Sequence, residues 1–413
     1  MGFTVTKISE GPVKPASLTP CPTLPLAWVD RYPTHRGLVE SMHLFKSGSE
    51  PAKVIKEALA KALVFFYPLA GRIVEPEPGH PAIECSAQGV YFAEAKADCT
   101  LEDVKYLDRP LLISKDDLVP YPKSEDWGVE PHNTIMMMQV TTFTCGGFVL
   151  GLRFNHASAD GMGAAQFIKA VGDMARGLPE PLVKPVWDRE KFPNPKIKPG
   201  PLPELPILAL DYVILDFPTD YINKLKSQYM EHSGKHCSGF DVLTAKLWQC
   251  RTRALNIAPD SEVKLCFFAS VRHLLKLDKG YYGNSIFPVK MTATSEKVLN
   301  STILEVVDII RKAKERMAVE FFQFAKEEVD TDPFQMTFNY ESVYVSDWSK
   351  LGFVDVDYGF GKPMFCGPLV NNDFIASVVI LKAPAPLDGT RILASCLTKE
   401  HSEEFVRGMK HME

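Results

Sequence analysis

The sequence predicts an α/β protein built from two domains of similar size. Segments with a helical apolar period alternate with short apolar segments typical of strands, and both kinds occur in each half of the 413 residues. Between the halves, a stretch from about Leu178 to Pro206 is too rich in proline for a helix or a central strand. Because a chain of this length suits about two cores, we expect domains at residues 1–178 and 207–413, joined by a linker at 179–206.

In the first half, apolar spacing and helix-stopping residues predict the elements. Residues 51–63 repeat apolar side chains at helical spacing, with lysines on the opposite face, and Tyr67-Pro68 ends this helix. A second helical stripe covers Phe167–Ala175 and stops at Gly177. Strands are expected at Ile83–Cys85, Val90–Ala95 and Gly147–Phe154.

The second half repeats the same kinds of element. A helix begins at Ser238, where Asp241 completes a capping box, and a long helix covers about Thr302–Lys326. Strands are expected at Lys264–Val271, Phe374–Lys382 and Arg391–Leu397. Helices and strands mixed through both halves indicate the α/β class.

Composition excludes several classes of function. A hydrophobic content of 46% and a charged content of 23% are ordinary for a soluble globular protein. The net charge of −5 argues against a nucleic-acid partner, which would need a basic face. The longest apolar runs have the length of a strand, so we expect no membrane-spanning segment.

Cysteine usage and the N-terminus favour a cytoplasmic protein. The nine cysteines are scattered and form no Cys-x-x-Cys pair, which is typical of reduced thiols. The N-terminus lacks the long apolar stretch of a signal peptide. Gly2 and Thr6 match a loose myristoylation pattern, but no basic cluster follows as a second anchor, so acylation of Gly2 stays open.

The segment Phe154-Asn-His-Ala-Ser-Ala-Asp-Gly161 carries the clearest chemistry in the chain. It places His156 at the end of a predicted buried strand and Asp160 four residues later, before a predicted helix. An imidazole can act there as a general base because its ordinary pKa lies near neutral pH. The spacing alone is weak evidence, since roughly half a match per chain arises by chance and a lone histidine is more often a satisfied core residue.

A second segment, Asp357-Tyr-Gly-Phe-Gly361, strengthens this motif. In this order and at this separation, the two segments resemble those of the plant BAHD acyltransferases, which move an acyl group from coenzyme A to an alcohol or amine. Tyr67–Arg72, Gln139–Gly147 and Gly280–Asn284 are similar to the same family. The nearest resemblance is to the branch that includes benzyl alcohol benzoyltransferases, monolignol acyltransferases and taxane acyltransferases.

The resemblance implies a more specific fold. It implies two chloramphenicol-acetyltransferase-like domains, each a mixed β-sheet with flanking helices, with a channel between them. In the family one late strand crosses back to the first domain, and the matching segment here is Met364–Ala383, residues 364–383.

The resemblance also assigns roles around the histidine. It implies that His156 is the general base and that Asp160, which Gly161 follows, pairs with Arg272 to hold the shape of the loop. Asp357, Gly359 and Gly361 are implied to be structural and remote from the reacting atoms. The family's usual form is Asp-Phe-Gly-Trp-Gly, whereas this chain has Tyr358 and Phe360, which keep the aromatic bulk.

Acyl-donor and oxyanion roles are implied for Ser346, Trp348 and Ser238. Ser346 and Trp348 match the family's Ser/Thr-x-Trp segment, although core packing explains the tryptophan equally well. Ser238 matches a contact to the pantetheine arm, and a helix cap is an equally good explanation. No Gly-x-Ser-x-Gly elbow occurs near a plausible base, which favours direct attack in a ternary complex over an acyl-enzyme.

Three other patterns are weaker. In Gly161–Gln166, a glutamine replaces the third small residue of a dinucleotide-binding fingerprint. Gly234 interrupts the helix that would align His232 and His236 on a metal, so we expect no metal site. The basic run Arg311–Arg316 fits a solvated helix face better than a site for the phosphates of coenzyme A.

The combined prediction is a monomeric, cytoplasmic acyltransferase of plant specialised metabolism. It uses acyl-CoA as a co-substrate, binds no resident cofactor, and transfers a hydroxycinnamoyl or benzoyl group, or an acetyl group, to an alcohol. Two alternatives stay open. One is an N-acyltransferase acting on a polyamine or arylamine, and the other is a non-catalytic binding protein of the same fold.

Overall fold

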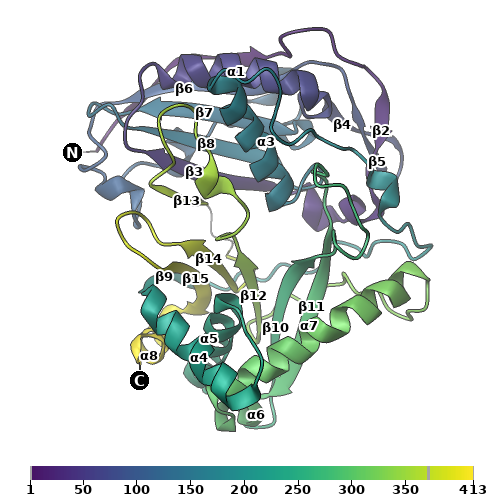
Figure 1. Ribbon diagram of the computed structural model, residues 1–413, viewed down its shortest axis with the longest axis vertical. Coiled ribbons are helices and arrows are strands. Elements are labelled where there is room, and N and C mark those ends of the chain that lie inside the picture. The colour runs from purple at the N-terminus through teal and green to yellow at the C-terminus, as the bar shows by residue number, and fades with distance from the viewer. Residues whose placement is uncertain (1, 370–372, 413) are drawn as a thin grey trace. The chain divides into compact units, whose positions relative to one another are not determined.

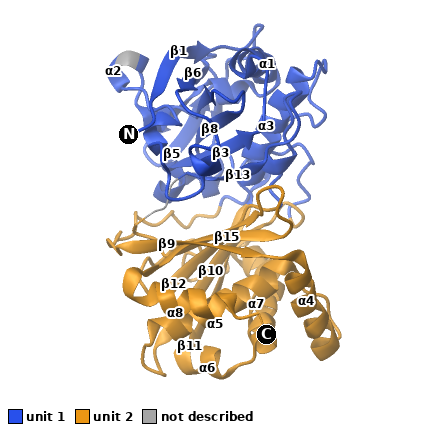
Figure 2. Cartoon of the chain, turned by 90° about the vertical axis from the view of Figure 1, so that its left-hand side faces the viewer, with its two compact units in different colours: residues 1–194, 275–285, 350–370 blue, residues 195–274, 286–349, 371–413 orange. Residues whose placement is uncertain are grey.

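The computed structural model describes residues 2–369 and 373–412, which divide into two compact units (Figure 2). The first unit comprises residues 1–194, 275–285 and 350–370, and the second comprises residues 195–274, 286–349 and 371–413. The division differs from the expected boundaries in two respects. The first part of the proline-rich stretch belongs to the first unit, which also takes two segments from the second half of the chain.

The first unit is organised around a mixed six-stranded sheet in the order β1-β6-β7-β8-β3-β13. β6 and β7 are parallel, and the other neighbours are antiparallel. The strands are β1 (Val5–Val13), β3 (Leu38–Phe45), β6 (Val90–Ala97), β7 (Met136–Thr142), β8 (Phe148–Asn155) and β13 (Phe365–Pro368). A smaller antiparallel sheet contains β2 (Thr23–Pro25), β4 (Arg72–Glu77) and β5 (His80–Glu84). All eight residues of β8 are buried, so the strand that leads to His156 is part of the core.

Two helices cover one face of this sheet (Figure 1). α1 (Pro51–Phe65) packs against α3 (Gly161–Ala175), and α2 (Ser124–Trp127) is a single turn. The apolar face expected for α1 is confirmed, because Ile55, Leu59, Ala62 and Leu63 are all buried. Two 3₁₀ turns also bear on the site: η1 (Trp28–Arg31) and η7 (Arg189–Lys191).

A short strand from late in the chain completes the first sheet. In β13, Phe365 lies opposite Leu44 and Pro368 lies opposite Ser41 on β3. The segment expected to cross, residues 364–383, therefore contributes 365–368 to this sheet. Residues 370–372 lie outside the described part of the chain, and β14 (Ser377–Lys382) pairs with β12 and β15 in the sheet of the second unit.

The second unit contains its own mixed six-stranded sheet, in the order β11-β10-β12-β14-β15-β9. Its remaining strands are β9 (Leu210–Phe217), β10 (Glu262–Ser270), β11 (Ile286–Thr294), β12 (Ser342–Asp347) and β15 (Thr390–Thr398). Its helices are α4 (Thr219–Ser233), α5 (Gly239–Leu255), α6 (Ser295–Asn300), α7 (Ile303–Ala325) and α8 (Lys399–Lys410). α5 packs against both α7 and α8. Among the described residues, no helix combines the length and the apolar composition needed to cross a bilayer.

The Asp357–Gly361 loop is built as a packing element of the first unit. Oδ1 of Asp357 accepts hydrogen bonds from the N–H groups of Gly359 and Gly361, at 2.7 and 2.9 Å. Both glycines have positive φ, +94° and +84°, a conformation that other residues rarely adopt. The ring of Phe360 meets Phe148 edge-on, with 5.7 Å between centroids, and Tyr358 is buried beside Phe45.

This loop contacts the C-terminal half of α3. A Cβ at Gly172 would lie 2.6 Å from the carbonyl oxygen of Asp357, and Arg176 donates to the same oxygen. Eleven residues separate Gly172 from Gly161, which corresponds to roughly 16 Å along a helix. The loop is therefore distant from His156, which precedes the other end of α3.

Replacing Tyr358 with phenylalanine should raise the free energy of unfolding by about 1 kcal/mol. The Tyr358 hydroxyl is buried without a hydrogen-bond partner in the described structure, so its removal deletes an unsatisfied polar group. Urea unfolding would measure the change. The matched control is Tyr229→Phe, which removes a hydrogen bond of 2.5 Å to Asp308 and should lower stability by a similar amount. A Tyr358→Phe protein that loses stability would contradict the unsatisfied hydroxyl.

Candidate active site

His156 lies in the tight turn that connects β8 to α3. Its N–H donates to the carbonyl of Gly37 at 3.0 Å. The preceding residue, Asn155, shapes the turn: its Oδ1 accepts from Ala157 N–H at 3.0 Å, and its carbonyl accepts from the Ser158 hydroxyl at 2.7 Å. The main chain around His156 is thus fixed by local hydrogen bonds at the end of a buried strand.

His156 is half-buried, and its imidazole stacks on the ring of His35. The two centroids are 5.2 Å apart and the ring planes differ by 20°. Nδ1 of His156 is buried and has no hydrogen-bond partner in the described structure. Nε2 is therefore the nitrogen available to a bound molecule.

Burial keeps both imidazoles neutral. Burial lowers the pKa of His156 below its ordinary value, although the nearby charge of Asp160 opposes this shift. Burial, and then the neighbouring His156, lower the pKa of His35 to about 3. The carbonyl of Val29 lies 2.6 Å from Nδ1 of His35, and because a carbonyl can only accept, that nitrogen carries the proton. His156 therefore has a neutral neighbour and is itself unprotonated near neutral pH.

Asp160 caps the helix that follows the turn. Its Oδ1 accepts from the N–H of Gly163 at 2.9 Å, which satisfies a donor in the first turn of α3. Its Oδ2 accepts from the N–H of Ser285 at 3.2 Å. Asp160 therefore links the first turn of α3 to a segment that is distant in sequence.

That segment, residues 280–285, lies directly on α3. A Cβ at Gly163 would be 1.9 Å from the carbonyl oxygen of Tyr282, so the main chains meet where only glycine fits. Nε2 of Gln166 donates to the carbonyl of Gly280 at 2.9 Å. Gly163 and Gln166, two residues of the near-fingerprint Gly161–Gln166, therefore have a packing role.

The sequence predicts no role for three buried polar side chains beside the turn: Asp30, Arg189 and Asn284. Their exposed fractions are 0, 2 and 0%. Burial raises the pKa of Asp30 to about 6, although the charge of Arg189 opposes this. Asn284 belongs to a stretch with family resemblance, but Asp30 and Arg189 stand alone in sequence and have no local signal.

The second unit contains the remaining predicted site residues. Ser238 caps α5 in a reciprocal capping box with Asp241, as expected, and Lys314 pairs with the other oxygen of Asp241 at 2.5 Å. Nε1 of Trp348 donates to Oγ of Ser346 at 3.1 Å, so the structure brings these two side chains together. Arg272 follows β10, and its pairing with Asp160 stays a prediction.

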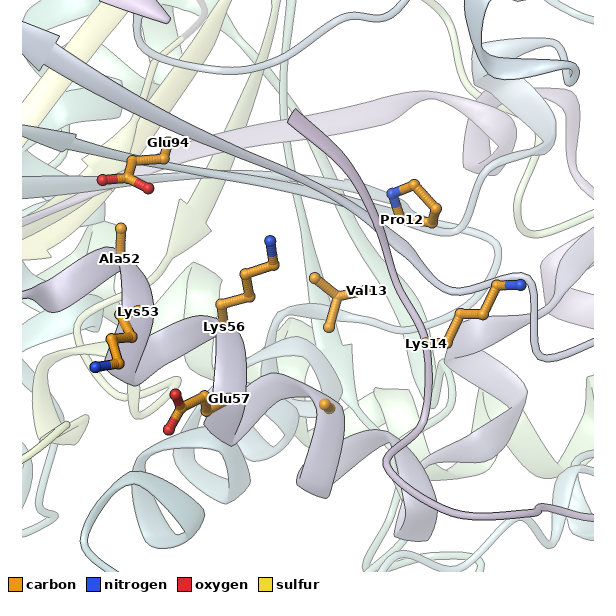
Figure 3. A pocket seen from close by; sticks show the side chains of 9 residues that line it. Pro12, Val13, Lys14, Ala52, Lys53, Lys56, Glu57 and Glu94 are labelled. Atoms are coloured by element: carbon orange, nitrogen blue, oxygen red, sulfur yellow. The ribbon is translucent and has the colours of Figure 1, made fainter. Parts of the chain in front are cut away.

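A pocket of about 570 Å³ on the first unit is separate from this histidine (Figure 3). It lies between the end of β1 and the exposed face of α1. Its polar lining includes Lys14, Lys53, Lys56, Glu57 and Glu94, and none of the predicted site residues lines it. The lysines are exposed surface side chains, so the pocket does not provide the buried, oriented groups that a reaction site needs.

Comparison with known sequences shows the family to which the chain belongs. A family model described as the Transferase family matches residues 3–412, so the chain belongs to this family. Acyl transferase 9 of Oryza sativa subsp. japonica is 81% identical over 409 residues, covering 99% of this chain and 98% of that protein. The predicted resemblance to the BAHD acyltransferases is confirmed, and the protein is an acyltransferase enzyme.

Two more distant relatives have specific names. A myricetin 3-O-glucosyl 1,2-rhamnoside 6'-O-caffeoyltransferase of Crocosmia x crocosmiiflora is 39% identical and covers 98% of each chain. A 3'-N-debenzoyl-2'-deoxytaxol N-benzoyltransferase of Taxus canadensis is 33% identical and covers 99% of this chain and 96% of its own.

Solved structures confirm the predicted fold class. Vinorine synthase matches with a TM-score of 0.74 at 20% identity, over 97% of this chain and 96% of that chain. TRI101 of F. sporotrichioides, in complex with coenzyme A and T-2, matches with a TM-score of 0.73 at 18% identity, over 93% and 97%. The two mixed sheets with flanking helices agree with this architecture.

Gly163→Ala should destabilise the protein by about 1–3 kcal/mol and lower its activity. The new methyl group would lie 1.9 Å from a main-chain oxygen of Tyr282, so α3 or the 280–285 segment has to shift. Thermal and urea unfolding would measure the loss. The control is Gly161→Ala, whose methyl group would meet only the end of the flexible Leu351 side chain, and which should change stability by less than about 1 kcal/mol. Equal stability of the two variants would contradict the close approach.

Proposed function

We propose that the protein transfers an acyl group from coenzyme A to an alcohol hydroxyl, with His156 as the general base. The observation that carries this proposal is the imidazole itself. It is neutral and partly exposed, it stands at the end of a core strand, and its Nε2 is the nitrogen available to substrate. A general base needs an accessible lone pair within reach of the proton that it removes.

The reaction follows from ordinary acyl-transfer chemistry. The acceptor oxygen attacks the thioester carbonyl carbon while Nε2 of His156 takes the hydroxyl proton. The resulting tetrahedral intermediate collapses as the carbon–sulfur bond breaks. The imidazolium then returns the proton to the departing coenzyme A thiolate, so the products are an ester and free thiol. Direct attack in a ternary complex needs no enzyme nucleophile.

We propose a structural role for Asp160. In a catalytic triad the carboxylate bonds to Nδ1 of the histidine and stabilises the imidazolium. Here both carboxylate oxygens accept main-chain N–H groups, and Nδ1 of His156 has no partner in the described structure. These contacts support a carboxylate that shapes the turn, with Arg272 as its proposed ionic partner and Gly161 as the first residue of the capped helix.

For the donor side, we propose that Ser346 and Trp348 support the oxyanion and the acyl-donor site. Their mutual hydrogen bond supports treating them as one element. Ser238 is proposed to contact the pantetheine arm, which is compatible with its role as a helix cap because a hydroxyl has two acceptor lone pairs. Asp357, Gly359 and Gly361 are proposed to support packing alone. The contacts of the Asp357 carbonyl with the far half of α3, and the hydrogen bonds of both glycines to the Asp357 carboxylate, support this role.

The proposed donor is an aromatic acyl thioester, hydroxycinnamoyl or benzoyl. The names of the Crocosmia caffeoyltransferase and the Taxus benzoyltransferase support this choice. The alternative is an amine acceptor, which is favoured by the N-benzoyltransferase name of the Taxus relative. We further propose a monomer that acts in the cytoplasm in plant specialised metabolism.

The direct test is release of free thiol from a panel of acyl thioesters offered with alcohols and amines. Wild-type protein should form product with an aromatic donor and an alcohol, and His156→Ala should lose at least about 1,000-fold in kcat, within the range that general-base and covalent-catalysis mutants show. Mass spectrometry of the product distinguishes an ester from an amide and names donor and acceptor.

The matched control is His236→Ala, the same substitution at an exposed histidine of the second unit. It should retain wild-type activity. A His156→Ala protein that is folded and equally active would refute the base assignment. Binding of coenzyme A without thiol release by any of the proteins would favour the binding-protein alternative.

The dependence of kcat/KM on pH offers a separate check on His156. The reaction needs the neutral imidazole, and burial lowers its pKa below the ordinary value of 6.5. The acidic limb of the profile should therefore be centred below pH 6.5, where protonation of the imidazole removes the base. Asp30, with a pKa of about 6, titrates on the same acidic side and does not move the limb upward. A limb centred above pH 6.5 would contradict a base whose pKa is lowered by burial.

A further inference from the structure

Two side chains that are distant in sequence donate hydrogen bonds to carbonyl groups of the His156 turn. Nδ2 of Asn284 donates to the carbonyl of His156 at 2.6 Å. Nη2 of Arg189 donates to the carbonyl of Ser158. The main chain on both sides of Ala157 is therefore held by side chains from other parts of the sequence.

Asp30 joins these two side chains. Its Oδ1 accepts from Asn284 at 2.7 Å, and its Oδ2 accepts from Nη1 of Arg189 at 3.0 Å and from the N–H of Ala27 at 2.9 Å. All three side chains are buried. Charge-assisted hydrogen bonds in such surroundings are strong and directional, so the three groups form one connected unit.

The place of Arg189 is itself fixed by neighbouring contacts. Its guanidinium lies 4.2 Å from the ring centroid of Trp187. Val186 forms a parallel bridge with Tyr281, and its N–H donates to the carbonyl of Gly280 at 2.9 Å. The proline-rich stretch thus lies beside the 280–285 segment, which contains Asn284. Because the two segments are adjacent, the side chains of Arg189 and Asn284 both reach the His156 turn.

We infer that Arg189 is a positioning residue for His156, which it holds in a reactive orientation through Ser158, Asp30 and Asn284. This inference rests on the proposed role of His156 as the base. Nδ1 of the imidazole has no hydrogen-bond partner among the described residues, so the orientation of the ring depends on the main chain of the turn and on stacking with His35. Hydrogen bonds that fix the main chain of the turn therefore also fix the position of the His156 imidazole.

The test compares Arg189→Lys with wild type in the thiol-release assay, after the productive donor and acceptor are known. Lysine keeps the positive charge but lacks the planar fork that reaches Asp30 and Ser158 together. We expect kcat to fall about 10- to 100-fold, the size of effect that a displacement of about 1 Å produces. KM for the acyl thioester should stay within about twofold, because on this account Arg189 does not touch substrate.

Arg391→Lys is the matched control. Arg391 is a buried arginine that pairs with Asp216 through two hydrogen bonds of 2.8 Å in the sheet of the second unit. The Arg391→Lys substitution should change the melting temperature by about as much as Arg189→Lys does. Its kcat per folded molecule should stay at the wild-type value. If Arg189→Lys does not fold, the Asn284→Ala variant tests the hydrogen bonds of Asn284 to Asp30 and His156 in the same network. Its activity would be measured below the melting temperature of that variant.

The double variant Arg189→Lys/His156→Ala separates positioning from general support. The arginine change should add less than about twofold to the loss already caused by His156→Ala, since groups that act as a unit are strongly non-additive. Wild-type kcat in folded Arg189→Lys, or a raised KM with unchanged kcat, would overturn the inference. Full activity of His156→Ala would instead remove the proposed function on which it rests.

Discussion

The buried carboxylate of Asp30 is the constraint on which the arrangement around His156 depends. A buried ionised group must be fully hydrogen-bonded, and the donors to Asp30 are the N–H of Ala27 directly before η1, Arg189 of η7 and Asn284 of the 280–285 segment. Removing one partner from such a pair costs about 3–5 kcal/mol, although the pair itself adds little to stability compared with a well-packed apolar core. Its consequence is geometric, because the carboxylate holds together three segments that are far apart in sequence.

A single segment, residues 280–285, meets the requirements of both the turn and the helix. Asn284 binds the turn, while Ser285 donates to the cap residue Asp160 and Tyr282 lies against Gly163. The main chain at both ends of the His156–Asp160 stretch is therefore set by the same few residues. A main chain fixed in this way can orient an imidazole whose Nδ1 has no hydrogen-bond partner in the described structure.

Local features were predictable from the sequence because their physical causes are local. The apolar spacing of α1, the capping box at Ser238 and the strand before His156 were all expected from neighbouring residues, and the structure confirms them. Arg189 was not predictable in this way. It lies in a stretch whose prolines indicate only a connector, and its partner Asp30 is 159 residues away. A pairing at that distance leaves no periodic or spacing signal in the sequence. The pairing of β13 with β3 likewise leaves no such local signal.

Among the described residues, no carboxylate is hydrogen-bonded to Nδ1 of His156, and this bears on the chemistry proposed for that residue. A triad carboxylate stabilises the imidazolium and so strengthens the base. Here burial disfavours the charged ring, and the pKa is lowered. In the proposed mechanism, the weaker base would remove a proton only as the carbon–oxygen bond forms. Its conjugate acid would be stronger and would readily protonate a thiolate, since a thiol has an ordinary pKa of about 8.5. An imidazole oriented by its main chain and tuned by burial thus suits a reaction that ends in a thiol.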